Sequence, residues 1–120
     1  MAVRAIRGAT QLTADDPAEM AEAVQDLLTE MLQRNGVGPD ALISLILTAT
    51  PDLRSTFPAT AARGLGLEDV PLLSAAELDI PGALPRVVRV LAHAELDVPR
   101  REVAHVYTRG AQVLRRDLAT

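Results

Sequence analysis

The sequence predicts a single α/β (α+β) domain in which a mixed five-stranded sheet carries one long helix and one short helix. Three observations support this fold class. The chain has 120 residues, the usual length of one domain, so we expect residues 1–120 to form one unit. Hydrophobic residues make up 48% and charged residues 23%, as in globular proteins. Segments with strand-like and helix-like patterns also alternate along the chain, without an internal repeat or a linker.

The first two elements are a strand and the long helix. Residues 3–12 mix β-branched and polar side chains and predict a strand, in which Gly8 marks a bulge or a close approach of another element. Asp16 is typical of a helix N-cap, because a proline follows it and Glu19 stands three residues further on. Apolar residues then recur at helical spacing until Asn35-Gly36 provides the stop: Met20, Val24, Leu27, Leu28 and Met31.

Residues 42–49 (L-I-S-L-I-L-T-A) are almost continuously apolar. An apolar run of this length favours a strand that is covered on both faces. One long helix covers about one face of the expected sheet. We therefore expect a partner subunit to cover the other face, and the protein to be an oligomer.

The other expected elements are short. Residues 58–63 predict a helix that begins at Pro58 and ends just before Gly64. Three more segments predict strands: residues 70–73, placed at a sheet edge by Pro71, and residues 86–94 and 103–114.

The composition argues against several classes of function. The chain has no cysteine, which excludes a disulfide framework, a thiol nucleophile and cysteine-ligated metal sites. A net charge of −4 and only two aromatic residues, Phe57 and Tyr107, argue against nucleic-acid binding. No apolar stretch reaches the ~18 residues that span a bilayer, and no apolar run of the kind found in a signal peptide develops around Arg4. We expect a cytoplasmic protein with no nucleic-acid or membrane partner.

All 12 basic residues are arginine, and several stand in or beside apolar runs. Arg7 lies within A-I-R-G-A, Arg89 within V-V-R-V-L, and Arg115 follows V-L. One such arginine alone is explained by a side chain that reaches solvent or pairs with a carboxylate. Several together favour a pocket for a small di- or trianionic molecule, because guanidinium groups bind carboxylates in a bidentate manner and do not titrate.

Glu77 and the two histidines are weaker candidates. Residues 74–77 (S-A-A-E) match a capping box, which would make Glu77 structural, although Pro81-Gly82 leave barely one turn of helix to cap. His93 and His105 lack the spacing of metal ligands and favour surface or packing roles. The sequence contains neither a complete phosphate-binding loop nor a serine-nucleophile motif, so we expect no cofactor and no metal.

Eight short motifs follow one another along the chain: R-G-A-T at 7–10, T-A-T-P-D-L at 48–53, F-P-A-T-A-A-R at 57–63, E-L-D at 77–79, R-V at 89–90, D-V-P at 97–99, H-V-Y at 105–107 and L-R-R-D-L at 114–118. Each motif alone is weak, but their order and spacing together are specific. They closely resemble the trimeric α/β type of chorismate mutase, as distinct from the all-helical type. The resemblance covers essentially the whole chain.

This resemblance implies a homotrimer that looks like an α/β barrel, with three active sites in clefts between neighbouring subunits. It also implies the Claisen rearrangement of chorismate to prephenate, on the route to phenylalanine and tyrosine. The rearrangement needs no nucleophile, metal or cofactor. The alternative, from another functional class, is a non-catalytic trimeric module that senses a small carboxylate.

The resemblance further implies residue roles. Arg89 matches the arginine beside the ether oxygen of the breaking bond, and Glu77 matches the glutamate that meets the ring hydroxyl. Arg7 matches the arginine that binds a substrate carboxylate and supports the ether-oxygen region. These three are the expected catalytic residues. Four further kinds of substrate contact are expected. Tyr107 matches a carboxylate-binding tyrosine, and Phe57 and Leu114 match apolar walls around the ring. Arg63 and Arg115 match basic residues at the mouth, and Leu73 and Ser74 are expected to face the substrate.

Overall fold

The computed structural model describes residues 2–115, and the last part of the final motif, residues 116–118, lies outside this range. Five strands and two α-helices are present in the described chain, together with three short 3₁₀ helices, which confirms the expected set of five strands with one long and one short α-helix. In chain order they are β1 (Val3–Gln11), α1 (Pro17–Arg34), η1 (Pro39–Ala41), β2 (Leu42–Ala49), α2 (Pro58–Gly64), β3 (Leu72–Ala76), β4 (Val87–Glu95), η2 (Arg100–Glu102), β5 (Val106–Tyr107) and η3 (Arg109–Leu114).

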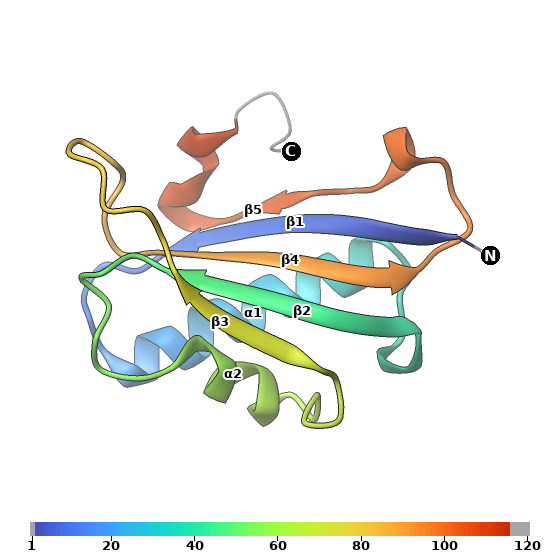
Figure 1. Ribbon diagram of the computed structural model, residues 1–120, viewed down its shortest axis with the longest axis horizontal. Coiled ribbons are helices and arrows are strands. Elements are labelled where there is room, and N and C mark those ends of the chain that lie inside the picture. The colour runs from blue at the N-terminus through green and yellow to red at the C-terminus, as the bar shows by residue number, and fades with distance from the viewer. Residues whose placement is uncertain (1, 116–120) are drawn as a thin grey trace.

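The five strands form one mixed sheet of order β3-β2-β4-β1-β5 (Figure 1). The central strand β4 is antiparallel to both of its neighbours, β1 and β2. The edge strands β3 and β5 run parallel to β2 and β1, respectively. Both α-helices pack into one core against the same face of the sheet. In the described part of the chain, the opposite face therefore carries no α-helix.

Helix α1 begins and ends where its sequence predicts. The Asp16 side chain accepts a hydrogen bond from the Glu19 N–H at 2.8 Å, and the Glu19 carboxylate accepts one from the Thr13 N–H at 2.6 Å. The first bond satisfies a backbone donor that the first helical turn leaves unpaired, and the second ties the preceding loop to the start of the helix. At the other end, Asn35 is the C-cap and Gly36 adopts a φ of 61°, which reverses the chain direction. All five predicted apolar residues of the helix are buried.

The core between helices and sheet is aliphatic, and β4 shows how the strands contribute to it. Val88, Val90, Ala92 and Ala94 are buried against the helices, whereas Arg89 is exposed on the open face. Tyr107 is the buried aromatic residue, and it packs in a smaller cluster with Ala9 and Ala111. No helix in the described range is both long and apolar enough to cross a membrane.

At Gly8 the backbone of β1 closely approaches side chains of α1. A Cβ atom on Gly8 would lie 2.3 Å from Sδ of Met31 and 3.2 Å from Cδ1 of Leu27. The β1–β4 register is continuous through Gly8. The expected close approach is therefore confirmed, and the alternative of a bulge at this position is wrong.

In the C-terminal half, one prediction is wrong and one alternative is excluded. Residues 103–114 do not form one strand: β5 has only two residues, and the chain then turns at Arg109, whose φ is 54°, into η3. Residues 74–77 do not cap a helix, because they complete the edge of the sheet. Ser74 pairs with Leu47 in the β2–β3 ladder, and the Glu77 N–H donates to the Ala49 carbonyl at 2.9 Å.

Three other predictions need adjustment. Residues 42–49 form the expected strand, but burial on both faces is absent in the single chain, because both helices lie on one side. Leu45 and Leu47 are buried, whereas Ile43 is 39% exposed. The edge strand expected at 70–73 is at the edge but spans Leu72–Ala76. Gly64 is the last residue of α2 rather than the first beyond it.

The contact at Gly8 gives a stability prediction. We expect Gly8→Ala to lower the free energy of unfolding by about 1–3 kcal/mol, because the new methyl group forces buried side chains of α1 to move. The matched control is Gly38→Ala, where a Cβ meets nothing within 4 Å and φ is negative, so stability should stay within about 0.5 kcal/mol. Urea denaturation of both variants measures the difference. Equal stabilities would show that α1 and β1 do not approach as described.

Candidate active site

Four of the predicted site residues surround one cavity on the open face of the sheet. Arg7, Glu77, Arg89 and Tyr107 line a space of about 280 Å³. Its other walls come from the same face of the strands and include Ile46, Thr48 and Leu91. The cavity therefore combines two fixed positive charges, one carboxylate and one phenol with an apolar floor.

Strand register brings these residues together. Arg89 of β4 lies opposite Thr48 of β2 on one side and opposite Ala9 of β1 on the other. Arg7 is two positions from Ala9 on β1, so its side chain shares the open face with Arg89. Residues more than 80 positions apart in the chain thus become neighbours through the pairing of β1 with β4.

Glu77 is fixed at both its backbone and its side chain. Its backbone N–H extends the β2–β3 ladder, as described above. Its Oε2 atom accepts a hydrogen bond from Oγ1 of Thr48 and lies 3.4 Å from Nε of Arg89. The Glu77 side chain is 21% exposed and that of Arg89 is 47% exposed. An ion pair this open to water adds little to stability, so its importance lies in orienting the two groups.

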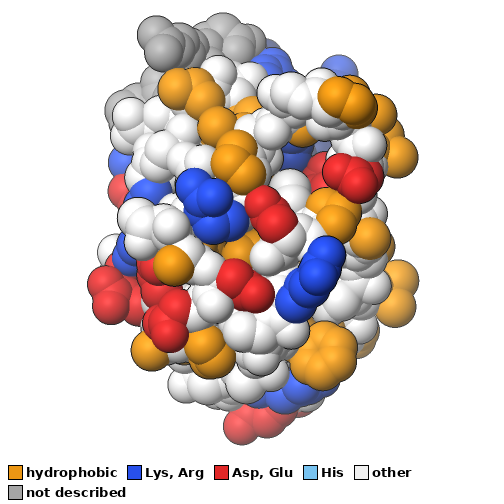
Figure 2. Space-filling view, turned by 90° about the vertical axis from the view of Figure 1, so that its left-hand side faces the viewer, with side chains coloured by type: hydrophobic (Ala, Val, Ile, Leu, Met, Phe, Trp, Pro, Cys, Tyr) orange, Lys and Arg blue, Asp and Glu red, His pale blue; other side chains and the backbone are white. Residues whose placement is uncertain are grey.

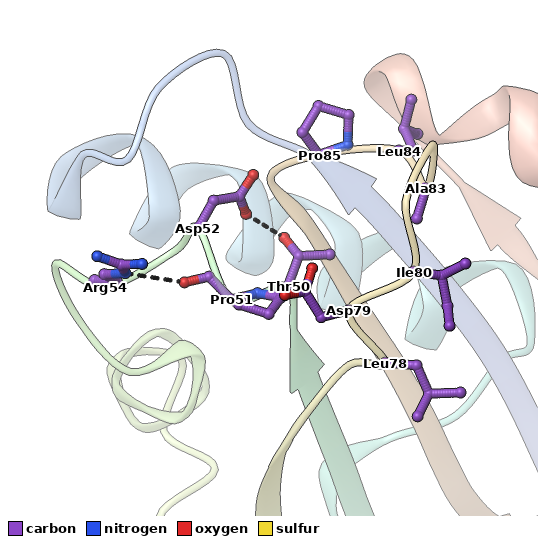
Figure 3. A pocket seen from close by; sticks show the side chains of 10 residues that line it. All are labelled: Thr50, Pro51, Asp52, Arg54, Leu78, Asp79, Ile80, Ala83, Leu84 and Pro85. Carbon is purple, nitrogen blue, oxygen red and sulfur yellow. Dashed lines mark hydrogen bonds between the residues drawn. The ribbon is translucent and has the colours of Figure 1, made fainter.

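A second cavity continues from Glu77 and Arg89 beneath the loop formed by residues 77–86. It measures about 350 Å³, and Leu114 lines it together with apolar side chains of the loop. The end of the loop is fixed because the Asp52 carboxylate accepts the Arg86 N–H at 3.0 Å. Figure 3 shows a third cavity, of about 250 Å³, between this loop and the turn at Thr50–Asp52. Apolar side chains of the 77–86 loop thus border the carboxylate–guanidinium pair.

The remaining predicted residues are not part of these cavities. Phe57 and Ser74 line a separate space of about 430 Å³ beside α2, and Phe57 is 70% exposed. Leu73 is also 70% exposed, and Arg63 is exposed on α2. Arg115, which follows η3, is partly buried, and its charge acts on His105. One chain therefore carries the predicted site as two separate groups of residues.

The surface at the left-hand end of the molecule in Figure 1 carries charges of both signs. Figure 2 shows acidic and basic side chains interspersed there, with hydrophobic side chains gathered at the upper right. An anion is therefore not attracted by a uniformly positive surface.

Comparison with known proteins agrees with the resemblance seen in the sequence. A family model described as chorismate mutase type I matches residues 3–118. The chain belongs to this family. The resemblance seen in the sequence and the expected enzyme class, an isomerase, are thereby confirmed.

Individual relatives match over nearly their whole length. The chorismate mutase AroH of Thermus thermophilus is 50% identical over 117 residues, which are 97% of this chain and 96% of that protein. The chorismate mutase AroH of Bacillus subtilis (strain 168) is 38% identical over 120 residues, 99% of this chain and 94% of that protein. A solved structure of a chorismate mutase from Clostridium thermocellum has a TM-score of 0.89 at 41% identity and covers 91% of this chain and 97% of its own. This structural match confirms the fold class.

Sequence reasoning about this chorismate mutase domain missed some residues that border the cavities. Thr48 was part of a quoted motif without a role, and Leu78, Ile80 and Leu84 of the loop were not singled out. For Thr48 a signal existed, because it is a polar residue on one face of a mostly apolar strand. For the loop residues no signal existed, since their position depends on the anchor at Asp52.

The two histidines have packing roles in the described structure. His93 contacts Ser44 across β2 and β4, with 3.2 Å between Nδ1 and Oγ. Nδ1 of His105 accepts a hydrogen bond from the Arg7 N–H at 2.9 Å. This bond lies directly before the first β1–β5 pair, Gly8 with Val106. Among the described residues, no three His, Cys, Asp or Glu side chains are grouped to hold a metal ion.

His105 gives a pH prediction for stability. Burial, and then the charges of Arg7 and Arg115, lower the pKa of His105 below its ordinary value of 6.5. The folded chain therefore binds this proton less readily than the unfolded chain. Its contribution to stability is complete above the unfolded pKa and is lost as the pH falls through 6.5 toward the lower folded pKa.

We expect the stability difference between the wild type and His105→Asn to shrink as the pH is lowered from about 7.5 to 5. Asparagine keeps an acceptor for the Arg7 N–H but does not titrate. Urea denaturation at one protein concentration measures this difference at each pH. Arg101→Ala, at an exposed position, serves as the control and should show a constant difference. A constant difference for His105→Asn as well would contradict the prediction.

Proposed function

We propose that this chain catalyses the Claisen rearrangement of chorismate to prephenate, in the biosynthesis of phenylalanine and tyrosine. The observation that carries the proposal is the joint cavity of Arg7, Glu77, Arg89 and Tyr107 in a member of the chorismate mutase type I family. Chorismate is a dicarboxylate with a ring hydroxyl. The cavity offers two guanidinium groups and a phenol for the carboxylates and a carboxylate for the hydroxyl.

In this proposal Arg89 is the principal catalytic charge. The rearrangement breaks an ether C–O bond, and negative charge develops on the ether oxygen in the transition state. A guanidinium group that is already in place stabilises this charge without a reorganisation step. The antiparallel pairing of β4 on both sides holds the Arg89 backbone, and Glu77 orients the guanidinium from the side.

The other residues of the cavity bind and orient the substrate. Arg7 and Tyr107 bind the carboxylates of the substrate. Glu77 accepts a hydrogen bond from the ring hydroxyl and balances positive charge that grows on the ring. Holding the substrate in its compact diaxial conformer brings the bond-forming carbons together, which removes an entropic part of the barrier. Leu114 and the apolar loop residues exclude water from one side.

We also propose that the enzyme is a homotrimer with its active sites between subunits. The supporting observation is the division of the predicted contacts into two groups on one chain. Arg7, Glu77, Arg89 and Tyr107 line one cavity, whereas Phe57 and Ser74 line another. The exposed apolar side chains of Phe57 and Leu73 and the open face of the sheet are surfaces that a neighbouring subunit would cover. A cytoplasmic location remains a prediction from the sequence.

A non-catalytic carboxylate sensor is the rival function. Such a module needs arginines that bind carboxylates, but it gains nothing from a guanidinium–carboxylate pair at the centre of the cavity. The pairing of Glu77 with Arg89 therefore favours the enzyme.

The first test is catalytic. We expect the purified protein to accelerate the loss of chorismate and the formation of prephenate, and Arg89→Ala to reduce kcat by about 10²–10³-fold, as when a preorganised donor is removed. The exposed Arg101→Ala should keep full activity, and the elution volume of all three proteins in size-exclusion chromatography should agree. A wild-type protein that binds chorismate without converting it would support the sensor instead.

The second test addresses the shared site. Arg89→Ala removes a residue of one group, and Phe57→Asp places a negative charge in the other, so each variant alone should be nearly inactive. Co-expressed at equal levels, they should regain about a quarter of wild-type activity, because every mixed ring of three contains one intact site. As the control, the two variants are purified separately and mixed under conditions without subunit exchange, where no activity should return. No recovery in confirmed mixed trimers would place the complete site within one chain.

A further inference from the structure

Thr48 is a polar residue of the active-site cavity to which neither the sequence motifs nor the proposed reaction gives a role. It stands on β2, where its neighbours toward the helices, Leu45 and Leu47, are buried in the aliphatic core. Thr48 itself is partly buried and lies on the open face, where it lines the cavity with Arg89 and Glu77. An apolar strand would be completed equally well by valine, which has the same branched outline.

The hydroxyl of Thr48 donates its hydrogen bond to Oε2 of Glu77. Register makes this contact possible, because Thr48 pairs with Arg89 on one side and with Ala75, two residues before Glu77, on the other. The three side chains therefore meet at the point where β3 ends. Within the described chain, Thr48 and Arg89 both contact the Oε2 atom of Glu77.

A carboxylate on the residue that ends a strand is otherwise free to rotate about its side-chain bonds. The Glu77 backbone is fixed by the ladder, but within residues 2–115 a single guanidinium, that of Arg89, reaches the carboxylate, at 3.4 Å and in partial contact with water. A neutral donor on a rigid central strand adds a second, directional restraint. It also binds Oε2 without adding a charge that would compete with Arg89 for the ligand.

We propose that Thr48 is a positioning residue that anchors Oε2 of Glu77, so that Oε1 is presented to the hydroxyl of the substrate and Arg89 stays directed at the reacting oxygen. This inference rests on the proposed function, because it assigns Thr48 a part in the same reaction. Thr48 acts through Glu77 and takes no part in bond making or breaking.

The test compares Thr48→Val with Thr48→Ser. Valine removes the donor but keeps the shape, and serine keeps the donor. We expect kcat/KM to fall about ten- to a hundredfold in Thr48→Val, the range for a lost hydrogen bond to a charged group, with most of the loss in kcat. Thr48→Ser should stay within about threefold of the wild type. Ser44→Ala is the matched control, since Ser44 is on the same face of β2 and contacts His93 rather than Glu77; it should retain full activity.

A double-mutant cycle separates positioning from packing. In a Glu77→Gln background, we expect Thr48→Val to cost at most about twofold, because the carboxylate on which Thr48 acts is already gone. The same tenfold or larger loss in both backgrounds would overturn the proposal and assign Thr48 a packing role. Unchanged activity of Thr48→Val, or a serine variant as poor as the valine variant, would also overturn it. Wild-type turnover of chorismate is measured first, so failure of the proposed function itself is seen independently.

Discussion

The arrangement of the candidate active site depends on the register of β4 between β1 and β2. β4 is the only strand that pairs antiparallel on both sides within the described chain, and its alternation sends valine and alanine side chains to the helices and Arg89 to the open face. A slip of one residue would bury the guanidinium in an aliphatic core and expose the valines. The hydrophobic effect that holds the core together thus also fixes the position of the Arg89 guanidinium, because both depend on the same register.

The charges of the site contribute more to geometry than to stability. The Arg89–Glu77 pair is half open to water on its arginine side, where an ion pair is worth at most about 1 kcal/mol. Burial of even one aliphatic side chain of the core contributes about 1.5–3 kcal/mol. The fold therefore does not need this pair, and the pair is free to be arranged for a ligand. A guanidinium group also stays charged at every physiological pH, which suits a rearrangement that moves charge without moving a proton.

Sequence patterns predicted the elements that are defined by local physics. The cap at Asp16, the buried stripe of α1 and the stop at Gly36 depend on residues within one turn of each other, and all three are confirmed. The strand predicted at residues 103–114 is wrong because the chain leaves the sheet at Arg109 through a φ of 54° that the sequence does not reveal. The capping-box reading of 74–77 was wrong for a similar reason, since a long-range ladder to β2 took precedence over a local motif. At the site, the family motifs located Arg7, Glu77, Arg89 and Tyr107, but the bond from Thr48 to Glu77 depends on strand pairing and could be found only in three dimensions.

The division of the predicted contacts between two cavities has a thermodynamic consequence for the trimer that we propose. A ligand that touches Arg89 on one subunit and Phe57 on the next can bind in full only to the assembled protein. Binding then stabilises the assembly by mass action, and assembly raises the affinity for the ligand by the same factor. In the proposed trimer, the open sheet face and the exposed side chains of Phe57 and Leu73 would provide the apolar surface for assembly. In such an enzyme, dissociation of the oligomer would also take the active site apart, because residues buried at the interface would lie next to those that contact the substrate.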